Sequence, residues 1–298
     1  MEKKWFVALL MVVVMMCACW TGAVADEERK TFTSGDYQYA LLDDGTVEIA
    51  GYKGSADLLA IPAELDGKAV TSIGDCAFYL CSSLTSVSIP DSVEQIGTNP
   101  FAACSALKTI SVSPEHLYFA TIDGVLFRKA DKALISYPAG IKSSTYTIPQ
   151  GIAAIGDGAF YSCYSLTSVF IPDSVTSIGD SAFAFCSSLT SVSIPDSVTS
   201  IGDGAFSSCD SLTSVSIPDS VTSIGDSAFY SCYHLTSVSI PDSVTAIGNT
   251  AFGCCFSLTS VSIPDSVTAI ESWAFYACSS LTSVSIPHFR PESQPLPL

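Results

Sequence analysis

The hydrophobic and polar positions of the chain follow a short pattern that the stretch Leu189–Ser211 shows in full. Within it, Ser191–Ile194 alternates polar and apolar residues, which is the period of a half-buried β-strand. Pro195–Ser197 predicts a turn, because proline cannot donate to a strand ladder and Asp and Ser favour turns. Val198–Ile201 then forms a second short extended segment. The apolar residues of Ala205–Leu212 recur at i, i+1, i+4 and i+7, which predicts a short helical turn.

This unit repeats along most of the chain, and we number its positions from its leading leucine. The interval from one leading leucine to the next is constant, as from Leu189 to Leu212, except that the interval from Leu107 to Leu166 is longer. A fixed period of this kind is typical of a solenoid, in which stacked coils form the core that no single coil can bury. We therefore predict a solenoid of 23-residue coils. The leading leucines are Leu84, Leu107, Leu166, Leu189, Leu212, Leu235, Leu258 and Leu281.

The irregular segments are predicted to belong to the same array, which we place at residues 56–287. The insert at about residues 111–147 contains the alternating segments TIDGVLF and ALISYP, so we expect an atypical pair of coils rather than a separate domain. Residues 26–55 hold two alternating runs joined by Asp44-Gly45, which predicts a hairpin that caps the N-terminal edge of the solenoid. Residues 288–298 form a Pro-rich tail, which favours a truncated reading frame over an irregular natural cap.

Residues 1–25 have the features of a secretory signal peptide. Two lysines precede an apolar core at Trp5–Met16, and an Ala-x-Ala cleavage site ends at Ala25. We expect cleavage after Ala25, with export to the medium or the cell surface. The apolar run is shorter than the roughly 20 residues of a membrane-spanning helix, and we expect no transmembrane segment. Cys19 leaves a lipid anchor as an alternative, although the residues before it fit a lipid-attachment site poorly.

Composition and charge narrow the classes of partner. The chain is 48% hydrophobic and 14% charged, which argues against disorder. It has 12 Lys and Arg against 29 Asp and Glu, a formal net charge of −17. This charge argues against nucleic acid and against electrostatic adhesion to anionic membranes.

Two columns of acidic residues recur from coil to coil. Position 15 carries aspartate in most coils, which raises the possibility of a calcium ladder. Thr98, Asn249 and Ser272 stand in the same column, however, and Asp, Asn, Ser and Thr together are the preferred helix N-cap residues. We therefore expect N-caps at position 15. For the column at position 8, Asp173–Asp265, we expect turn formation, with a solubilising stripe or cation binding as alternatives.

Eight of the ten cysteines after Ala25 fall in one column at position 21. In an exported protein an even number of cysteines usually indicates disulfides. These cysteines share an inward face with Ala and Phe, however, and neighbours in a parallel stack lie slightly too far apart for an unstrained bridge. A straight column also cannot supply four converging metal ligands. We expect a buried ladder of free thiols, no metal site and no cofactor.

Catalysis is not indicated by any motif of the chain. Its three histidines do not recur with the repeat, and no glycine-rich phosphate loop, nucleophile elbow or zinc-protease motif is present. We expect a protein that is not an enzyme.

Differences between otherwise similar coils point to a candidate binding surface. Positions 19, 20, 22 and 23 flank the buried cysteine, and we expect them to point outward. Their aromatic side chains are candidate anchors for a protein partner. The favoured interpretation is that these side chains pack over the turns of the adjacent coils, and anchoring of a partner is the alternative. The serines at positions 3 and 5 offer a second, more uniform surface. The candidate binding residues are Tyr161, Tyr164, Phe185, Tyr230, Tyr233, His234, Phe256 and Tyr276.

The unit resembles the BspA-type leucine-rich repeat of bacterial surface proteins. The resemblance is carried by the pattern L-x-x-V-x-I-P-x-x-V-x-x-I-G-x-x-A-F-x-x-C-x-S at Leu189–Ser211, and by DGTVEIAGYKGSA at Asp44–Ala56. It implies a curved solenoid with a parallel β-sheet on the concave face and short helical turns on the convex side. It also implies surface display and adhesion to host, matrix or other cell-surface proteins.

Three functions remain open at this point. The first is an exported, adhesin-like protein that binds protein partners. The second is a structural spacer, which the uniformity of the repeats favours, because a specific site normally breaks symmetry. The third and most remote is an ice- or glycan-binding array of Ser and Thr.

Overall fold

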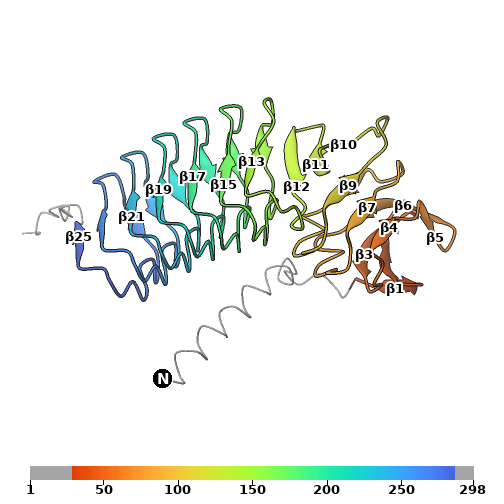
Figure 1. Cartoon of the computed structure of the whole chain (residues 1–298), viewed down its shortest axis with the longest axis horizontal. Coiled ribbons are helices and arrows are strands. Elements are labelled where there is room, and N and C mark those ends of the chain that lie inside the picture. The colour runs from red at the N-terminus through yellow and green to blue at the C-terminus, as the bar shows by residue number, and fades with distance from the viewer. Residues whose placement is uncertain (1–28, 286–298) are drawn as a thin grey trace, which may run out of the picture.

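The computed structural model describes residues 29–285 as strands and turns stacked in coils along the long axis of the molecule (Figure 1). The signal peptide, Cys19 and the Pro-rich tail lie outside the described residues. Each regular coil contributes a three-residue strand at positions 3–5 and a two-residue strand at positions 12–13. The predicted solenoid with parallel strands is therefore confirmed.

From residue 145 onward, the three-residue strands form a seven-stranded parallel sheet with a register of one full repeat, so that Ser191 pairs with Ser214. Those of the first coils, Leu58–Ala60, Ser86–Ser88 and Thr109–Ser111, form a separate three-stranded sheet. In Ser191–Ser193 and Ser214–Ser216 the central valine is buried and the flanking serines face outward. The strands of the seven-stranded sheet, in spatial order, are β13 (Thr145–Thr147), β15 (Ser168–Phe170), β17 (Ser191–Ser193), β19 (Ser214–Ser216), β21 (Ser237–Ser239), β23 (Ser260–Ser262) and β25 (Ser283–Ser285).

The two-residue strands belong to a nine-stranded sheet that also contains the insert. Its first three strands form an antiparallel meander, and the remaining strands are parallel. In spatial order they are β10 (Phe119–Ile122), β11 (Val125–Arg128), β12 (Ala133–Ser136), β14 (Ala154–Ile155), β16 (Ser177–Ile178), β18 (Ser200–Ile201), β20 (Ser223–Ile224), β22 (Ala246–Ile247) and β24 (Ala269–Ile270).

The N-terminal end has the predicted hairpin, in which two antiparallel strands are joined around Asp44-Gly45. The first hairpin strand, Tyr37–Leu41, also pairs with Thr31–Ser34. The second hairpin strand, Val47–Tyr52, runs parallel to Lys68–Ile73 of the first coil, with Val47 opposite Val70. The sheet edge is thus covered by local chain. The strands of this end are β1 (Thr31–Ser34), β2 (Tyr37–Leu41), β3 (Val47–Tyr52), β4 (Leu58–Ala60), β5 (Glu64–Leu65), β6 (Lys68–Ile73), β7 (Ser86–Ser88), β8 (Gln95–Ile96) and β9 (Thr109–Ser111).

The predicted helical turns are wrong: the segment after the second strand is a series of tight turns, and the described residues contain no helix. In the coil of Ala205, the amides of Gly204, Phe206 and Ser208 donate to carbonyls of the next coil, at 2.7–2.8 Å. The amides between them close turns onto carbonyls three residues back. Gly204 and Ser208 have φ of 61° and 57°, as the third residue of a type II turn requires. Because every second amide is committed to the next coil, a helical ladder cannot form.

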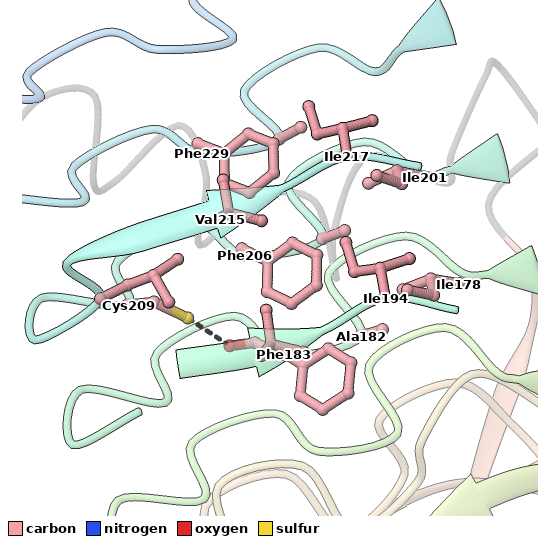
Figure 2. Close-up of a cluster of buried hydrophobic side chains, with 14 of the residues drawn as sticks. Ile178, Ala182, Phe183, Ile194, Ile201, Phe206, Cys209, Val215, Ile217 and Phe229 are labelled. Carbon is pink, nitrogen blue, oxygen red and sulfur yellow. Dashed lines mark hydrogen bonds between the residues drawn. The ribbon is translucent and has the colours of Figure 1, made fainter. Parts of the chain in front are cut away.

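A column of phenylalanine rings forms the centre of the core (Figure 2). Successive rings from Phe160 to Phe275 lie 4.8–5.4 Å apart with interplanar angles of 2–6°. Leucines at position 1, valines at positions 4 and 10 and isoleucines at positions 6 and 13 pack around them. The apolar positions predicted from the repeat are therefore the core positions.

The insert extends the sheet, but as a meander with a shortened coil rather than as a pair of coils. Leu134 pairs with Ile155 at position 13, and Tyr137 makes the hydrogen bond of position 18, from its amide to the carbonyl of Ala159. Two residues separate Leu134 from Tyr137, whereas a regular coil has four at this place. One turn is therefore missing, and a cleft of about 240 Å³ lies there, lined by Thr98, Asp157 and Arg128 among others.

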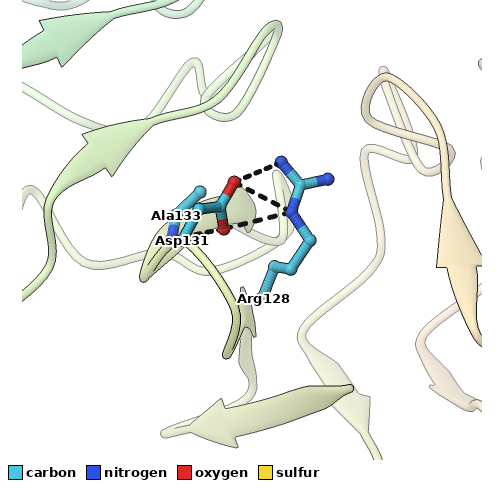
Figure 3. A network of polar contacts seen from close by, with 3 residues as sticks. All are labelled: Arg128, Asp131 and Ala133. Carbon is cyan, nitrogen blue, oxygen red and sulfur yellow. Dashed lines mark hydrogen bonds and ion pairs between the residues drawn. The ribbon is translucent and has the colours of Figure 1, made fainter.

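Asn99 crosses the base of this cleft and connects the two halves of the solenoid. Its side chain is 2% exposed, donates to the carbonyl of Gly158 at 2.5 Å and accepts from the hydroxyl of Ser136 at 2.8 Å. Beside the cleft, Nε of Arg128 donates to both carboxylate oxygens of Asp131, and Nη2 donates to Oδ2 (Figure 3). Asp131 also accepts a hydrogen bond from the amide of Ala133. Polar side chains thus replace the contacts that the missing turn makes elsewhere.

Two glycines of one coil should differ sharply in their tolerance of alanine. A Cβ at Gly202 would lie 2.6 Å from the amide nitrogen of Asp180 and 2.7 Å from the carbonyl carbon of Gly179. A Cβ at Gly204 would meet only side-chain atoms, Oγ of Ser181 at 3.3 Å and Cβ of Ser207 at 3.8 Å, and its φ of 61° is unfavourable for alanine. We expect Gly202→Ala to lower the free energy of unfolding by about 3 kcal/mol and Gly204→Ala by about 1 kcal/mol. Guanidinium unfolding followed by circular dichroism measures both, and equal losses would contradict the close approach of the coils.

Removing the side chain of Asn99 should weaken the junction between the two halves. Asn99→Ala leaves the hydroxyl of Ser136 and the carbonyl of Gly158 without this partner, so we expect a loss of about 2 kcal/mol. Ser181→Ala, at the same position of a regular coil, is the matched control, with an expected change within about 0.5 kcal/mol. Guanidinium unfolding followed by circular dichroism measures both variants. A loss in the free energy of unfolding no larger than that of Ser181→Ala would contradict the bridging role of Asn99.

Candidate functional site

The aspartates of position 15 bind the backbone of the next coil, so the predicted N-cap role is wrong. The carboxylate of Asp180 accepts the amide of Asp203 at 2.8 Å, and Asp203 accepts that of Asp226 at 2.7 Å. No helix is present in the described residues for them to cap, and the amides that they bind lie one coil away. Within residues 29–285, no group of three or more His, Cys, Asp or Glu side chains is arranged to hold a metal ion.

The turns at position 8 are closed through the backbone, as the Pro-Asp-Ser sequence predicts. The amide of Val198 donates to the carbonyl of Pro195 at 3.0 Å, and the other regular coils repeat this bond. From Ser174 to Ser266, the serine that follows the aspartate donates to the preceding coil, as Ser197 does to the carbonyl of Val175 at 2.6 Å. The position-8 column therefore marks turns that are linked by serine hydroxyls.

The cysteines of position 21 form the expected inward column of free thiols. The thiol of Cys209 donates to the carbonyl of Phe183 in the preceding coil at 3.2 Å (Figure 2), and equivalent bonds of 3.0–3.7 Å recur along the array. Burial, followed by the neighbouring thiols, raises the pKa of Cys209 well above its usual value. The column is therefore packing material for the core rather than a reactive site.

The candidate aromatic residues fall into two groups with different environments. Tyr161, Phe185 and Tyr230, at positions 19 and 20, pack over the turns, as the interpretation of packing over the adjacent coils predicts. Tyr230 is only 6% exposed and its ring covers Gly253 of the next coil. The rings of Tyr161 and Phe185 lie 5.2 Å apart and are half-buried.

Candidate residues at positions 22 and 23 do point outward. The rings of Tyr233 and Phe256 stack at 5.1 Å with an interplanar angle of 5°, and they are 38% and 43% exposed. His234 beside them is exposed, and its Nδ1 lies 2.7 Å from the carbonyl oxygen of Asp210. Since a carbonyl only accepts, Nδ1 carries the proton and Nε2 is left as an acceptor. We call Tyr233, His234 and Phe256 the aromatic patch.

The remaining two candidate residues are separate from the aromatic patch. Tyr164 is 49% exposed but belongs to a coil three repeats before that of Tyr233. Tyr276 packs edge-on against Trp273, with ring centroids 5.1 Å apart, in the last described coil. The structure therefore brings together only part of the predicted set.

A notch on the face formed by the turns of positions 14–23 was not predicted from the repeat. Position 19 is tyrosine in the coils of Tyr161 and Tyr230 but Ala184 and Ser207 in the two coils between them. A hollow of about 170 Å³ lies there, with Phe185 and Gly204 also in its wall. The signal was present in the sequence as two adjacent small residues in a column that otherwise carries several tyrosines.

The sheet face is a second exposed surface. Its outward serines repeat without variation from β17 to β25, and Phe170 in β15 replaces one of them. Phe170 is 56% exposed, which makes it a large apolar side chain on an otherwise small and polar face.

The model of the BspA-type leucine-rich repeat region matches residues 64–142, 136–255 and 199–290 of this solenoid. The chain belongs to the BspA-type leucine-rich repeat family. Repeats of this family are typically non-enzymatic, and the buried cysteines and stacked phenylalanines are its repeat core in this protein.

Solved structures of bacterial leucine-rich repeat proteins resemble the chain. A protein of Eubacterium ventriosum is 19% identical, with a TM-score of 0.53 and coverage of 87% of this chain and 85% of that one. The pneumococcal vaccine antigen PcpA is 16% identical, with a TM-score of 0.52 and coverage of 88% and 99%. These two share the fold. A leucine-rich cell-surface protein of Faecalibacterium prausnitzii is 27% identical, with a TM-score of 0.37 and coverage of 88% and 90%.

A comparison with curated protein sequences finds no significant match. Across residues 29–285, this leucine-rich repeat protein has no helix of the length and apolarity needed to cross a membrane.

Thiol labelling should separate the buried cysteine column from the exposed cysteines. Counting the ten cysteines from Cys76 to Cys278, we expect only the partly exposed Cys76, Cys254 and Cys278 to react with Ellman's reagent in the native protein. The other seven are buried and should react only in denaturant, because burial suppresses the thiolate. Rapid native labelling of Cys209 or Cys232, identified by mass spectrometry, would contradict the ladder.

Proposed function

We propose that this protein is exported, is displayed at or released from the cell surface, and binds protein partners without catalysing a reaction. The observation that carries the proposal is the aromatic patch. Two large rings that stack on each other in solvent are unusual for a surface with no partner, since aromatic residues are enriched at protein interfaces. Export is supported by the signal-peptide features of Met1–Ala25.

The geometry of the patch favours docking of a protein rather than of a small molecule. Tyr233 and Phe256 come from neighbouring coils whose backbones are held by the core, so little side-chain freedom is lost on binding. His234, anchored to Asp210, offers a hydrogen-bond acceptor at the edge of the apolar surface. An apolar centre with a polar rim is the usual arrangement of an interface.

A spacer role is the second candidate, and the uniform serine face supports it. From β17 to β25 the outward positions of the three-residue strands are all serine, which provides no anchor for a specific ligand. In that case the solenoid would only project another part of the protein from the surface.

A binding screen with two matched aromatic variants tests the proposal. The probe is a panel of purified extracellular matrix proteins immobilised on a biosensor, with the protein as analyte. For a partner that is retained, we expect the double variant Tyr233→Ser, Phe256→Ser to weaken binding by about tenfold or more, because the anchors are lost.

The control is Phe170→Ser, which removes an equally exposed ring from the sheet face. It should leave binding unchanged. Loss of binding in this control alone would place the interface on the serine face and overturn the aromatic patch. Failure of the unaltered protein to bind any member of the panel would favour the spacer role.

A further inference from the structure

The notch over Ser207 is a partly apolar hollow on the turn face, and carboxylates stand at its rim. Its wall includes the rings of Tyr161 and Phe185 on one side and Asp203 and Asp226 on the other. We propose that this notch binds a cationic side chain of a protein partner, arginine in preference to lysine. The inference rests on the proposed protein-binding function and states what chemistry the partner presents.

The apolar part of the notch results from an interruption of the tyrosine column. Tyr230 covers Gly253, the residue of the next coil, and thereby leans away from the notch. Tyr161 leans the same way and lies against Phe185. The coil that follows that of Phe185 has the small, buried Ser207 at this position in place of a tyrosine, and a hollow of about 170 Å³ lies beside Ser207 and Gly204.

The acidic part consists of two carboxylates from the position-15 column. Asp203 uses Oδ1 to accept the backbone amide of Asp226. Asp226 uses Oδ1 to accept the backbone amide of Asn249 and Oδ2 to accept a hydrogen bond from the side-chain amide of Asn249 at 3.0 Å. A carboxylate has about four acceptor sites, so each retains capacity for a further donor. Both residues are exposed, and neither takes part in the ion pairs found within residues 29–285, Arg29–Glu48 and Arg128–Asp131.

Stacking these carboxylates one coil apart makes the rim unfavourable for further negative charge. The pKa of Asp203 is raised by burial and, to a smaller extent, by the charges of Asp180 and Asp226. A bound cation would offset this repulsion. The net charge of the chain, −17, would also attract cationic partners at a distance.

Arginine fits this combination better than lysine does. Its planar guanidinium stacks on aromatic faces and presents a fork of donors that can reach two carboxylates together. Its methylene stem is apolar and would lie along the ring of Phe185. Lysine offers a point charge that makes fewer simultaneous contacts.

A tripeptide titration tests the proposal without requiring a natural partner. The probes are acetyl-Gly-Arg-Gly-amide and acetyl-Gly-citrulline-Gly-amide, which have nearly the same shape but differ in charge. The protein is labelled with ¹⁵N, and amide shifts are followed during the titration. We expect saturable shifts at Gly204, Ser207 and Ser227 with the arginine peptide and about tenfold weaker binding of the citrulline peptide.

Three variants separate the notch from general attraction to an acidic surface. Asp203→Asn with Asp226→Asn retains the oxygen that accepts the backbone amide and should weaken arginine binding by about tenfold. Ser207→Tyr introduces the residue that the following coil has at this position, Tyr230, and should abolish binding without loss of thermal stability. Asp75→Asn, in the same column but outside the notch, should have no effect.

Equal binding of both peptides, or unchanged binding in the double asparagine variant or in folded Ser207→Tyr, would overturn the proposal. The outcome is distinguishable from that of the matrix-protein screen. If arginine binds in the notch but no matrix protein is retained, only the proposed protein-binding function is contradicted. If a matrix protein is retained but the arginine peptide causes no specific shifts, only the proposal of an arginine-binding notch is contradicted.

Discussion

The stacking of each coil on the next is the constraint on which the rest of this structure depends. A single coil is too thin to enclose its own leucines and phenylalanines, so its apolar atoms are covered only by neighbours. The same neighbours receive its hydrogen bonds. Strand amides, threonine and serine hydroxyls, position-15 carboxylates and cysteine thiols all reach a partner about one repeat away. Core and polar ladder are therefore one cooperative unit.

This division of hydrogen bonds decides the conformation of the turn face. A helix would require each amide to bond within its own coil, but alternate amides bond to the coil that follows. The coil then needs left-handed residues at positions 16 and 20, and most are not glycine, among them Ser181, Phe185 and Thr250. Such residues are strained, and the contacts on both sides hold them in place. Regular glycine is kept at position 14, where backbones of adjacent coils approach most closely.

The candidate functional features of this solenoid lie where one coil differs from its neighbours. The insert removes a turn and opens a polar cleft bridged by Asn99, and two small residues at position 19 open the notch. The aromatic patch arises in the same way, from two neighbouring coils that carry rings where others carry serine or aspartate. Each feature uses the rigid backbone of the solenoid and changes only side chains or one turn. A binding surface can therefore be altered without disturbing the core.

Several features could be predicted without a structure: the coil length, the inward positions, the parallel strands, the N-terminal hairpin and the inward cysteine column. These follow from periodicity, because an apolar residue that recurs once in every coil has no other place than the shared core. Three other features depend on contacts between coils. Asp203 binds the backbone of the next coil instead of capping a helix, and Ala205–Leu212 forms turns. Tyr230 is buried against the next coil, whereas Tyr233 is exposed. In each case the competing conformations have the same local pattern, and the partner that selects one of them lies a full repeat away along the chain.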